Sequence, residues 1–251
     1  MKYICAFGLM MMLAASVFAG EIKNGNDLIA AMYGKYAGKW YKTLTFEQKT
    51  TNFAPDGTAT VATWYEAMKV PGCLRIDIAP TEKGDGILFK DGKVFSFKDG
   101  ATKGGRDFVH PLLVVGFDVY GQPVETTIEQ VKKMGIDLSI LHTEKWQGRS
   151  VYVLGAEKGD LRSPQLWVDK KRLVFVRLIQ QAGKDKKSVA ETQFNKYVKA
   201  GGGWVAAEVL FYVDGKKTTS EDYTRIKADV KLNDDLWDPE KWMSVDKSYW
   251  K

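Results

Sequence analysis

The stretch Pro164-Gln-Leu-Trp-Val-Asp-Lys-Lys-Arg-Leu-Val-Phe-Val-Arg-Leu-Ile179 decides the fold class. It predicts two strands joined by a tight polar turn at residues 169–172, because β-branched and aromatic residues recur at strand spacing on either side. The second strand predicts two apolar faces: Val174, Val176 and Leu178 on one, and Leu173, Phe175 and Ile179 on the other. A sheet that is dry on both faces needs apolar material in front and behind, and the rest of the chain must supply both.

Turn signals separate strand-like runs along most of the chain. Asp-Gly, the strongest short hairpin signal, occurs at residues 56–57, 91–92, 99–100 and 214–215. Tight turns join antiparallel neighbours, so these runs predict one large antiparallel sheet of roughly 11–12 strands. An open sheet of that size must curl. We therefore expect a mainly β protein of the α+β class.

Two regions depart from the two-residue period and predict helices. Asn24 begins the first helix, which ends near Gly38. Pro111 and Pro123 open two more helices between residues 107 and 135, and Gly135 ends the second of these. Three helices on a curved sheet favour a single domain in which the helices fill the concave face.

The first 19 residues predict a secretory signal peptide. Lys2 supplies the positive start, residues 4–13 form an apolar run, and Val17 and Ala19 precede the expected cut. A membrane anchor is the alternative, but the run is shorter than the ~20 residues that a bilayer requires. We expect a mature domain of residues 20–251, exported in soluble form to a bacterial periplasm without stable membrane insertion.

The charge pattern and the cysteine content indicate which partners and crosslinks to expect. The whole chain has a formal net charge of +6, yet its basic residues interleave with acids along the strands. This pattern indicates solvated sheet faces and argues against nucleic acid, while a mild attraction to anionic membranes is the functional alternative. Cleavage would leave Cys73 as the one cysteine, so no internal disulfide is expected.

Catalytic patterns are sparse. The two histidines, His110 and His142, accompany neither a Gly-x-Ser-x-Gly elbow nor a His-Glu-x-x-His pair. Cys73 has no evident base nearby, so we interpret it as a packing or rim thiol. Residues 103–106 (Lys-Gly-Gly-Arg) are interpreted as a flexible loop, with an anion site as the alternative. We expect no metal, no cofactor and no enzymatic activity.

Several features now coincide: the signal peptide and first helix, the hairpin at 64–77 (Trp-Tyr-Glu-Ala-Met-Lys-Val-Pro-Gly-Cys-Leu-Arg-Ile-Asp), the Leu-Trp-Val-Asp strand at 166–169 followed by Phe-Val-Arg-Leu at 175–178, and the tail Asn-Asp-Asp-Leu-Trp-Asp-Pro at 233–239. In this order the chain resembles the LolA/LolB-like family of periplasmic lipoprotein-sorting proteins. The resemblance covers essentially the whole mature chain.

The resemblance implies an incomplete β-barrel with a helical lid, in which acyl chains of a lipoprotein or lipid bind between sheet and lid. It implies a monomeric carrier that moves this cargo towards the outer membrane, with transfer partners at the inner and outer membranes. Val70 stands where the carrier branch has a lid-latching arginine, so that latch is not carried over. The chain is also longer than the compact carriers, which leaves the cargo open: a lipoprotein, a free lipid or another amphiphile.

We expect the cavity lining to come from apolar residues of the helical insertion and the facing strands. Plain core packing is the alternative for each residue taken singly, and the collective arrangement favours a cavity. The expected lining residues are Leu112, Leu113, Phe117, Val131, Trp167, Phe175 and Phe211.

Two other functions remain open. A sensor or regulatory subunit on the same scaffold would bind lipid or protein. A hydrolase is disfavoured, because it would need Cys73 or a serine within hydrogen-bond reach of His110 or His142.

Overall fold

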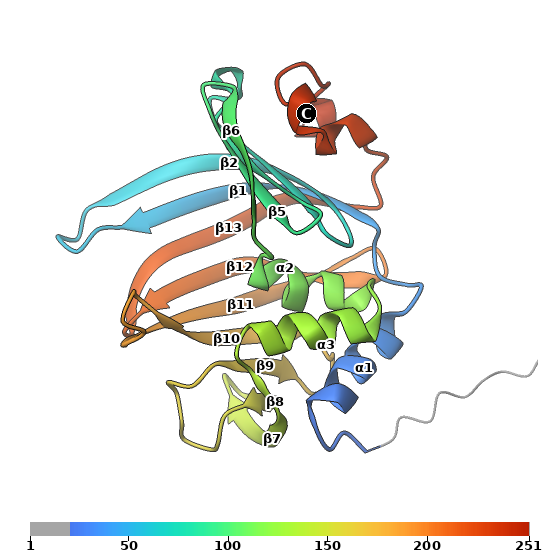
Figure 1. Cartoon of the computed structure of the whole chain (residues 1–251), viewed down its shortest axis with the longest axis vertical. Coiled ribbons are helices and arrows are strands. Elements are labelled where there is room, and N and C mark those ends of the chain that lie inside the picture. The colour runs from blue at the N-terminus through green and yellow to red at the C-terminus, as the bar shows by residue number, and fades with distance from the viewer. Residues whose placement is uncertain (1–20, 251) are drawn as a thin grey trace, which may run out of the picture.

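The computed structural model describes residues 21–250, so the predicted signal peptide lies outside the described residues. Thirteen strands form one antiparallel sheet in the order β6-β5-β4-β3-β2-β1-β13-β12-β11-β10-β9-β8-β7 (Figure 1). The strands are β1 (Thr43–Phe53), β2 (Ala59–Lys69), β3 (Cys73–Ile78), β4 (Gly86–Lys90), β5 (Lys93–Lys98), β6 (Ala101–Asp107), β7 (Asp137–Trp146), β8 (Arg149–Gly155), β9 (Gln165–Asp169), β10 (Phe175–Ala182), β11 (Ser188–Ala200), β12 (Gly203–Val213) and β13 (Lys216–Ala228).

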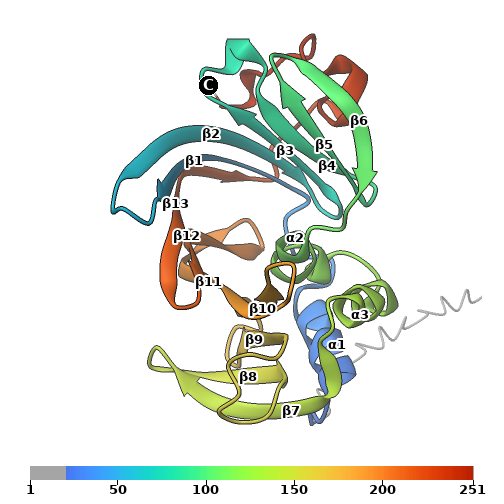
Figure 2. The ribbon, with the colours of Figure 1, turned by 60° about the vertical axis from the view of Figure 1, so that its left-hand side comes forward.

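The connectivity explains where the helices lie. The chain starts in the middle of the sheet at β1, runs outward to the edge strand β6, and re-enters at the opposite edge, β7. Helices α2 (Pro111–Gly116) and α3 (Val124–Lys133) form the connection between the two edges. With α1 (Gly25–Tyr36), they lie across the open side of the curled sheet (Figure 2). The predicted incomplete barrel with three helices is thus confirmed.

Short 3-10 helices complete the described elements: η1 (Thr81–Lys83), η2 (Asp118–Tyr120), η3 (Asp234–Trp237), η4 (Pro239–Lys241) and η5 (Ser248–Trp250).

The sheet has thirteen strands where the sequence predicted roughly 11–12, and β6 is a strand that the sequence did not predict. Residues 103–106, expected to be a loop, lie within this exposed edge strand. Its sequence is polar and glycine-rich, so it carries no apolar alternation. Gly105 is needed there because a Cβ at this position would lie 2.6 Å from Cζ of Phe95 on β5. The glycine lets the phenylalanine ring rest on the edge strand.

The first helix begins as its sequence predicts. The side chain of Asn24 accepts a hydrogen bond from the backbone N–H of Asp27 at 3.1 Å, which caps the free amides of the first turn. Leu28 and Met32 are fully buried. A Cβ at Gly25 would lie 2.7 Å from Leu154 Cδ1 of β8, so the helix packs directly on this end of the sheet.

The hairpin of β9 and β10 corrects one expectation. Phe175 pairs with Val168, whereas Arg177 pairs with Trp167, so the register shifts by one residue at Val176. A single inserted residue exchanges the faces of all later residues in its strand. Phe175 and Leu178 therefore share the inner face, while Ile179 lies on the outer one.

The outer face of β2–β5 is covered by the C-terminal segment. Leu236, Trp237 and Trp242 are buried against Ala67 and Leu88 of the sheet. The Trp242 ring stacks on Phe97 with the ring centroids 3.9 Å apart. The side chains that alternate outward from these strands are therefore dry.

A buried ion pair joins this segment to β3. Arg75 and Asp77 are both fully buried, and Arg75 Nε donates to Asp77 Oδ2 at 2.6 Å. The guanidinium also donates to the Trp242 carbonyl at 2.8 Å and lies 3.8 Å from the centroid of its ring. Lys247 and the Tyr249 hydroxyl reach Asp77 from the tail, at 3.1 Å and 2.7 Å. The tail thus satisfies charges that the outer face would otherwise leave uncompensated.

Replacing Arg75 by alanine should lower the free energy of unfolding by about 3–5 kcal/mol, because the buried carbonyls of Leu236 and Trp242 would lose their donor and Asp77 would lose its guanidinium partner. Urea denaturation followed by tryptophan fluorescence measures this loss. Lys93→Ala is the matched control, since it breaks the exposed pair with Asp107 and should leave stability nearly unchanged. Equal effects of the two substitutions would show that the buried pair does not anchor the tail.

Candidate functional site

The inner face of the sheet changes character along β1. Leu44 and Phe46 are buried apolar residues, and Gln48 and Thr50 further along the same face are buried polar residues. The residues paired with them on the neighbouring strands lie on the same face. These are Met68, Glu66 and Trp64 on β2, and Tyr223 and Glu221 on β13. The concave face therefore has an apolar half and a half with polar groups.

The helices cover the apolar half. Phe117, after α2, meets Phe194 of β11 with ring centroids 6.3 Å apart, and Phe175 meets Phe194 at 4.7 Å. A Cβ at Gly116 would lie 3.0 Å from the Phe194 ring, so glycine allows α2 to approach the sheet closely. We call α2, η2 and α3 the lid, residues 111–133.

Two hydrogen bonds tie η2 of the lid to the sheet. The Phe175 backbone N–H donates to the Tyr120 hydroxyl at 3.1 Å. The Gly72 N–H, in the β2–β3 turn, donates to the Asp118 carboxylate at 3.0 Å. Burial raises the pKa of Asp118 to about 7, and the bond from Gly72 opposes that rise. The lid is thus attached at the β2–β3 turn, next to Val70.

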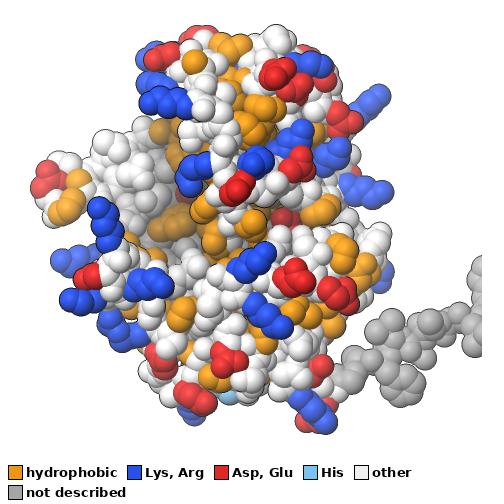
Figure 3. All heavy atoms as spheres, in the orientation of Figure 1, with side chains coloured by type: hydrophobic (Ala, Val, Ile, Leu, Met, Phe, Trp, Pro, Cys, Tyr) orange, Lys and Arg blue, Asp and Glu red, His pale blue; other side chains and the backbone are white. Residues whose placement is uncertain are grey.

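The other half of the concave face is open. Figure 3 shows a hollow beside the lid with apolar side chains in its depth. Trp64, Phe211 and Tyr223 point to this side of the sheet and are each half-buried. Apolar surface of this kind, continuous with a covered core, suits an apolar ligand.

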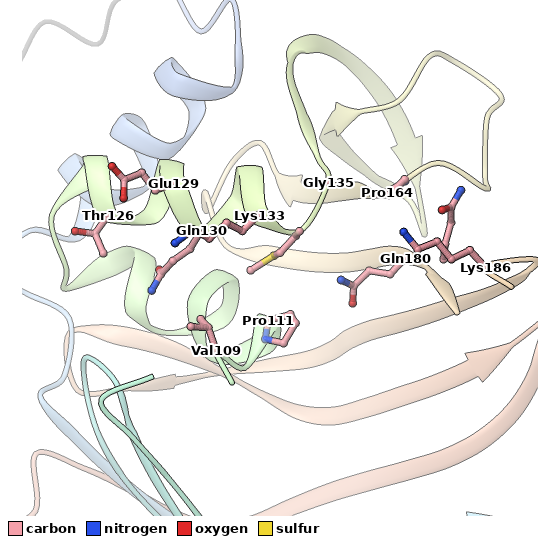
Figure 4. Close-up of a pocket in the computed structure, with 12 residues that line it drawn as sticks. Val109, Pro111, Thr126, Glu129, Gln130, Lys133, Gly135, Pro164, Gln180 and Lys186 are labelled. Carbon is pink, nitrogen blue, oxygen red and sulfur yellow. The ribbon is translucent and has the colours of Figure 1, made fainter. Parts of the chain in front are cut away.

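A cleft of about 770 Å³ lies at the rim of the lid, between α3 and the β10–β11 hairpin (Figure 4). Gln130 and Lys133 border it from the helix, and Gln180 and Lys186 border it from the hairpin. Pro111 lies at its base. Polar and basic side chains therefore frame the gap between lid and sheet.

The predicted lining residues divide into three groups. Leu113, Phe117, Val131 and Phe175 are buried in the core that contains the contact between lid and sheet. Leu112 and Phe211 are half-buried beside that core. Trp167 forms the third group by itself.

Trp167 alternates to the outer face. It lies 6.1 Å from the Trp146 ring and under the guanidinium of Arg177 at 4.6 Å. Its neighbours in β9, Leu166 and Val168, point inward instead, because successive side chains of a strand face opposite sides. We therefore leave Trp167 out of the groove lining.

The sequence reasoning missed the polar groups of the groove, Glu66 and Glu221. One signal for Glu66 is visible in the sequence. It shares a strand face with Trp64 and Met68, and a lone acid between large apolar residues at two-residue spacing marks a charge on a dry face.

The candidate catalytic groups have other partners. His110 Nδ1 accepts the Leu112 N–H at 3.2 Å as the cap of α2, and burial lowers the pKa of His110 to about 4. His142 contacts Glu144 at 3.0 Å. Burial raises the pKa of the Cys73 thiol to about 11, which opposes formation of the nucleophilic thiolate. In residues 21–250, no cluster of His, Cys, Asp and Glu is arranged to hold a metal.

Comparison with solved structures identifies the fold. A putative outer membrane lipoprotein-sorting protein domain from Vibrio parahaemolyticus has a TM-score of 0.59 and 12% identity, over 86% of this chain and 97% of that one. A DUF1329 family protein from Desulfovibrio piger has a TM-score of 0.58 and 17% identity, over 85% and 95%. A LolA superfamily protein from Nitrosomonas europaea has a TM-score of 0.52 and 13% identity, over 83% and 96%.

These likenesses define a LolA-like fold and confirm the architecture that the sequence resemblance implied. At such low identity they establish the fold alone. No family model and no curated protein matches the chain in sequence. Among the helices of the described residues, none is both long and apolar enough to span a membrane.

Replacing Asp118 by asparagine should change how stability depends on pH. The folded wild-type chain keeps the Asp118 proton up to about pH 7, whereas the unfolded chain releases it near pH 4. The free energy of unfolding of the wild type therefore falls through this window, by up to about 1.4 kcal/mol per pH unit from this group. Asp118→Asn removes that contribution, so its stability relative to the wild type should rise from pH 4 to 7 and then stay level.

Urea denaturation across this pH range measures the difference. Asp118→Ala is the control: it also removes the charge, but it leaves the Gly72 N–H without its acceptor and should be less stable than Asp118→Asn throughout. Parallel stability curves for the wild type and Asp118→Asn would contradict the assignment.

Proposed function

We propose that this protein is a soluble periplasmic carrier. It binds the acyl chains of a lipoprotein or lipid in the groove between sheet and lid and moves them towards the outer membrane. The observation that carries the proposal is the concave face, apolar and half-covered by three helices while its other half is open. The LolA superfamily and lipoprotein-sorting proteins that share the fold support the same interpretation.

The structure suits reversible opening. The lid helices are short, with α2 of six residues and α3 of ten, and they rest on the sheet largely through apolar contacts. An acyl chain that replaces the lid side chains gains about 0.8 kcal/mol for each buried CH₂ group. Cargo can therefore offset the loss of contacts such as Phe117 with Phe194 when the lid moves.

Export follows from the predicted signal peptide, and residues 20–251 form the proposed carrier domain. We propose that it acts as a monomer, with membrane-bound partners that load and unload it. A catalytic role is not proposed, because His110 caps α2 and Cys73 packs against the cluster formed with the C-terminal segment. A sensor or regulatory subunit would share the scaffold, and it is distinguished by a stable protein partner together with weak or absent uptake of acyl chains.

Phe211→Asp should weaken binding of a fluorescent fatty-acyl probe at least roughly tenfold, since it places a charge on the apolar wall of the groove. Tyr212→Asp is the matched control, because the side chain of Tyr212 points to the opposite face of β12. Probe titration and native mass spectrometry of the exported chain measure the affinity and any acyl species bound at one to one. A chain that stays free of lipid and takes up no probe would sink the carrier proposal.

Amide hydrogen exchange should be faster in residues 107–135 than in the β9–β10 hairpin, residues 164–180. The helices must leave the sheet to admit cargo, and mobile elements belong to the least stable parts of a fold. Adding a fatty-acyl lipid should slow exchange in the lid by occupying the groove. Equal protection of the two segments, with and without lipid, would argue that these helices do not open.

A further inference from the structure

Two carboxyl groups lie on the inner face of the groove. Glu66 of β2 is 4% exposed, and its carboxyl group, unlike that of Glu221, takes part in no hydrogen bond among the described residues. It lies between Phe46 on β1 and Ile76 on β3. An acid in this setting is an unpartnered polar group at the floor of an otherwise apolar region.

Glu221 of β13 lies further towards the open end of the same face. Its carboxylate accepts a hydrogen bond from the Tyr223 hydroxyl at 2.8 Å. Gln48 and Thr50 of β1, which face it, are buried and bonded to each other at 2.7 Å. Glu221 and Tyr223 are half-buried, so this part of the face is reached from the hollow.

The surroundings hold no compensating cation among the described residues. Burial raises the pKa of Glu66, and the neighbouring charge of Glu221 raises it further. Burial likewise raises the pKa of Glu221 to about 7, and the hydrogen bonds from Tyr223 and Gln48 oppose this. Within residues 21–250, the titratable groups that interact with this pair are the two acids themselves, Tyr223 and Tyr249, none of which supplies a positive charge. A positive group brought from outside would relieve the repulsion.

We propose that Glu66, opposite Phe46 on β1, contacts the ammonium group of an amine-bearing amphiphile whose apolar chain lies under the lid, and that Glu221, opposite Thr50 further along the face, adds negative charge nearby. This inference rests on the proposed carrier function and names its cargo class. An ammonium donates up to three hydrogen bonds, and its positive charge balances the negative charge of a carboxylate. A fatty acid would instead place a third negative charge beside them.

The arrangement of the groove matches the two ends of such a molecule. Phe117, Phe175 and Phe194 form the apolar end beneath the lid, where α2 covers the sheet. Glu66 lies where the apolar face begins to change, and Glu221 lies beyond it towards the hollow. A ligand with its chain under the lid therefore presents its head group to the acids.

The test compares three probes of equal chain length below their micellar concentrations: dodecylamine, dodecan-1-ol and dodecanoate. Calorimetric titration of the delipidated, exported chain at about pH 8 should give roughly tenfold or more tighter binding of the amine than of the alcohol. The alcohol reports the apolar groove, and the difference between amine and alcohol reports the acids. Dodecanoate should bind most weakly.

Glu66→Gln should reduce amine affinity roughly tenfold and leave alcohol affinity unchanged. Glutamine keeps the size and shape of the side chain but cannot carry the negative charge of the carboxylate. Glu221→Gln should act in the same direction. Asp222→Asn is the matched control: it removes an equal charge from the opposite face of β13 and should change neither affinity.

A measurement on the wild-type chain avoids dependence on the variants. At about pH 6 Glu221, whose pKa is raised to about 7 by burial, is largely protonated, so binding of the alkylammonium should release protons. The heat of binding in two buffers of different ionisation enthalpy reports that release. Binding of dodecan-1-ol should release none.

The outcomes separate the two claims. Equal affinities for amine and alcohol, or full amine affinity in Glu66→Gln, would overturn the ammonium subsite and leave the carrier intact. If none of the three probes binds, the carrier proposal fails and the subsite fails with it.

Discussion

A thirteen-strand sheet that does not close must keep water from the apolar parts of both its faces, and the rest of the fold meets this requirement. The inner face receives three helices, and the outer face of β2–β5 receives the C-terminal segment. The buried pair of Arg75 and Asp77 exists because that second cover is complete. The charges belong to the outer face by alternation, yet the tail removes them from water and supplies their partners.

The spacing of apolar residues and turn signals in the sequence predicted much of this architecture. Alternating residues and Asp-Gly turns located most strands, and Pro111 and Asn24 located helix starts, because these signals act within a few residues. The failures were longer in range. The register shift at Val176 depends on how β9 and β10 pair, and β6 depends on the Phe95 ring that Gly105 accommodates. Neither contact leaves a periodic trace in its own segment.

The site was less predictable than the fold for a related reason. Phe117 and Phe175 could be proposed because large apolar residues in the insertion and facing strands converge on any lid. Trp167 was misplaced since size indicates burial without indicating which side of a sheet. Glu66 and Glu221 come from strands that are far apart in the sequence. They share a face only because each of these strands pairs separately with β1. The sequence of β2 marks Glu66 as an acid on a dry face, but the relation of Glu66 to Glu221 is a product of topology.

The ladder between β1 and β13 also has a mechanical consequence. All other neighbouring strands follow one another in the chain, so this ladder is the one seam joining the first six strands to the last seven. Its register shifts between Thr45 and Glu47, where the hydrogen bonding is interrupted. Bending along a single seam would change the angle between two otherwise continuous plates. The lid is bonded to both plates, through Gly72 of the β2–β3 turn and Phe175 of β10, so any bending at this ladder would change the fit of the lid as well as the width of the groove.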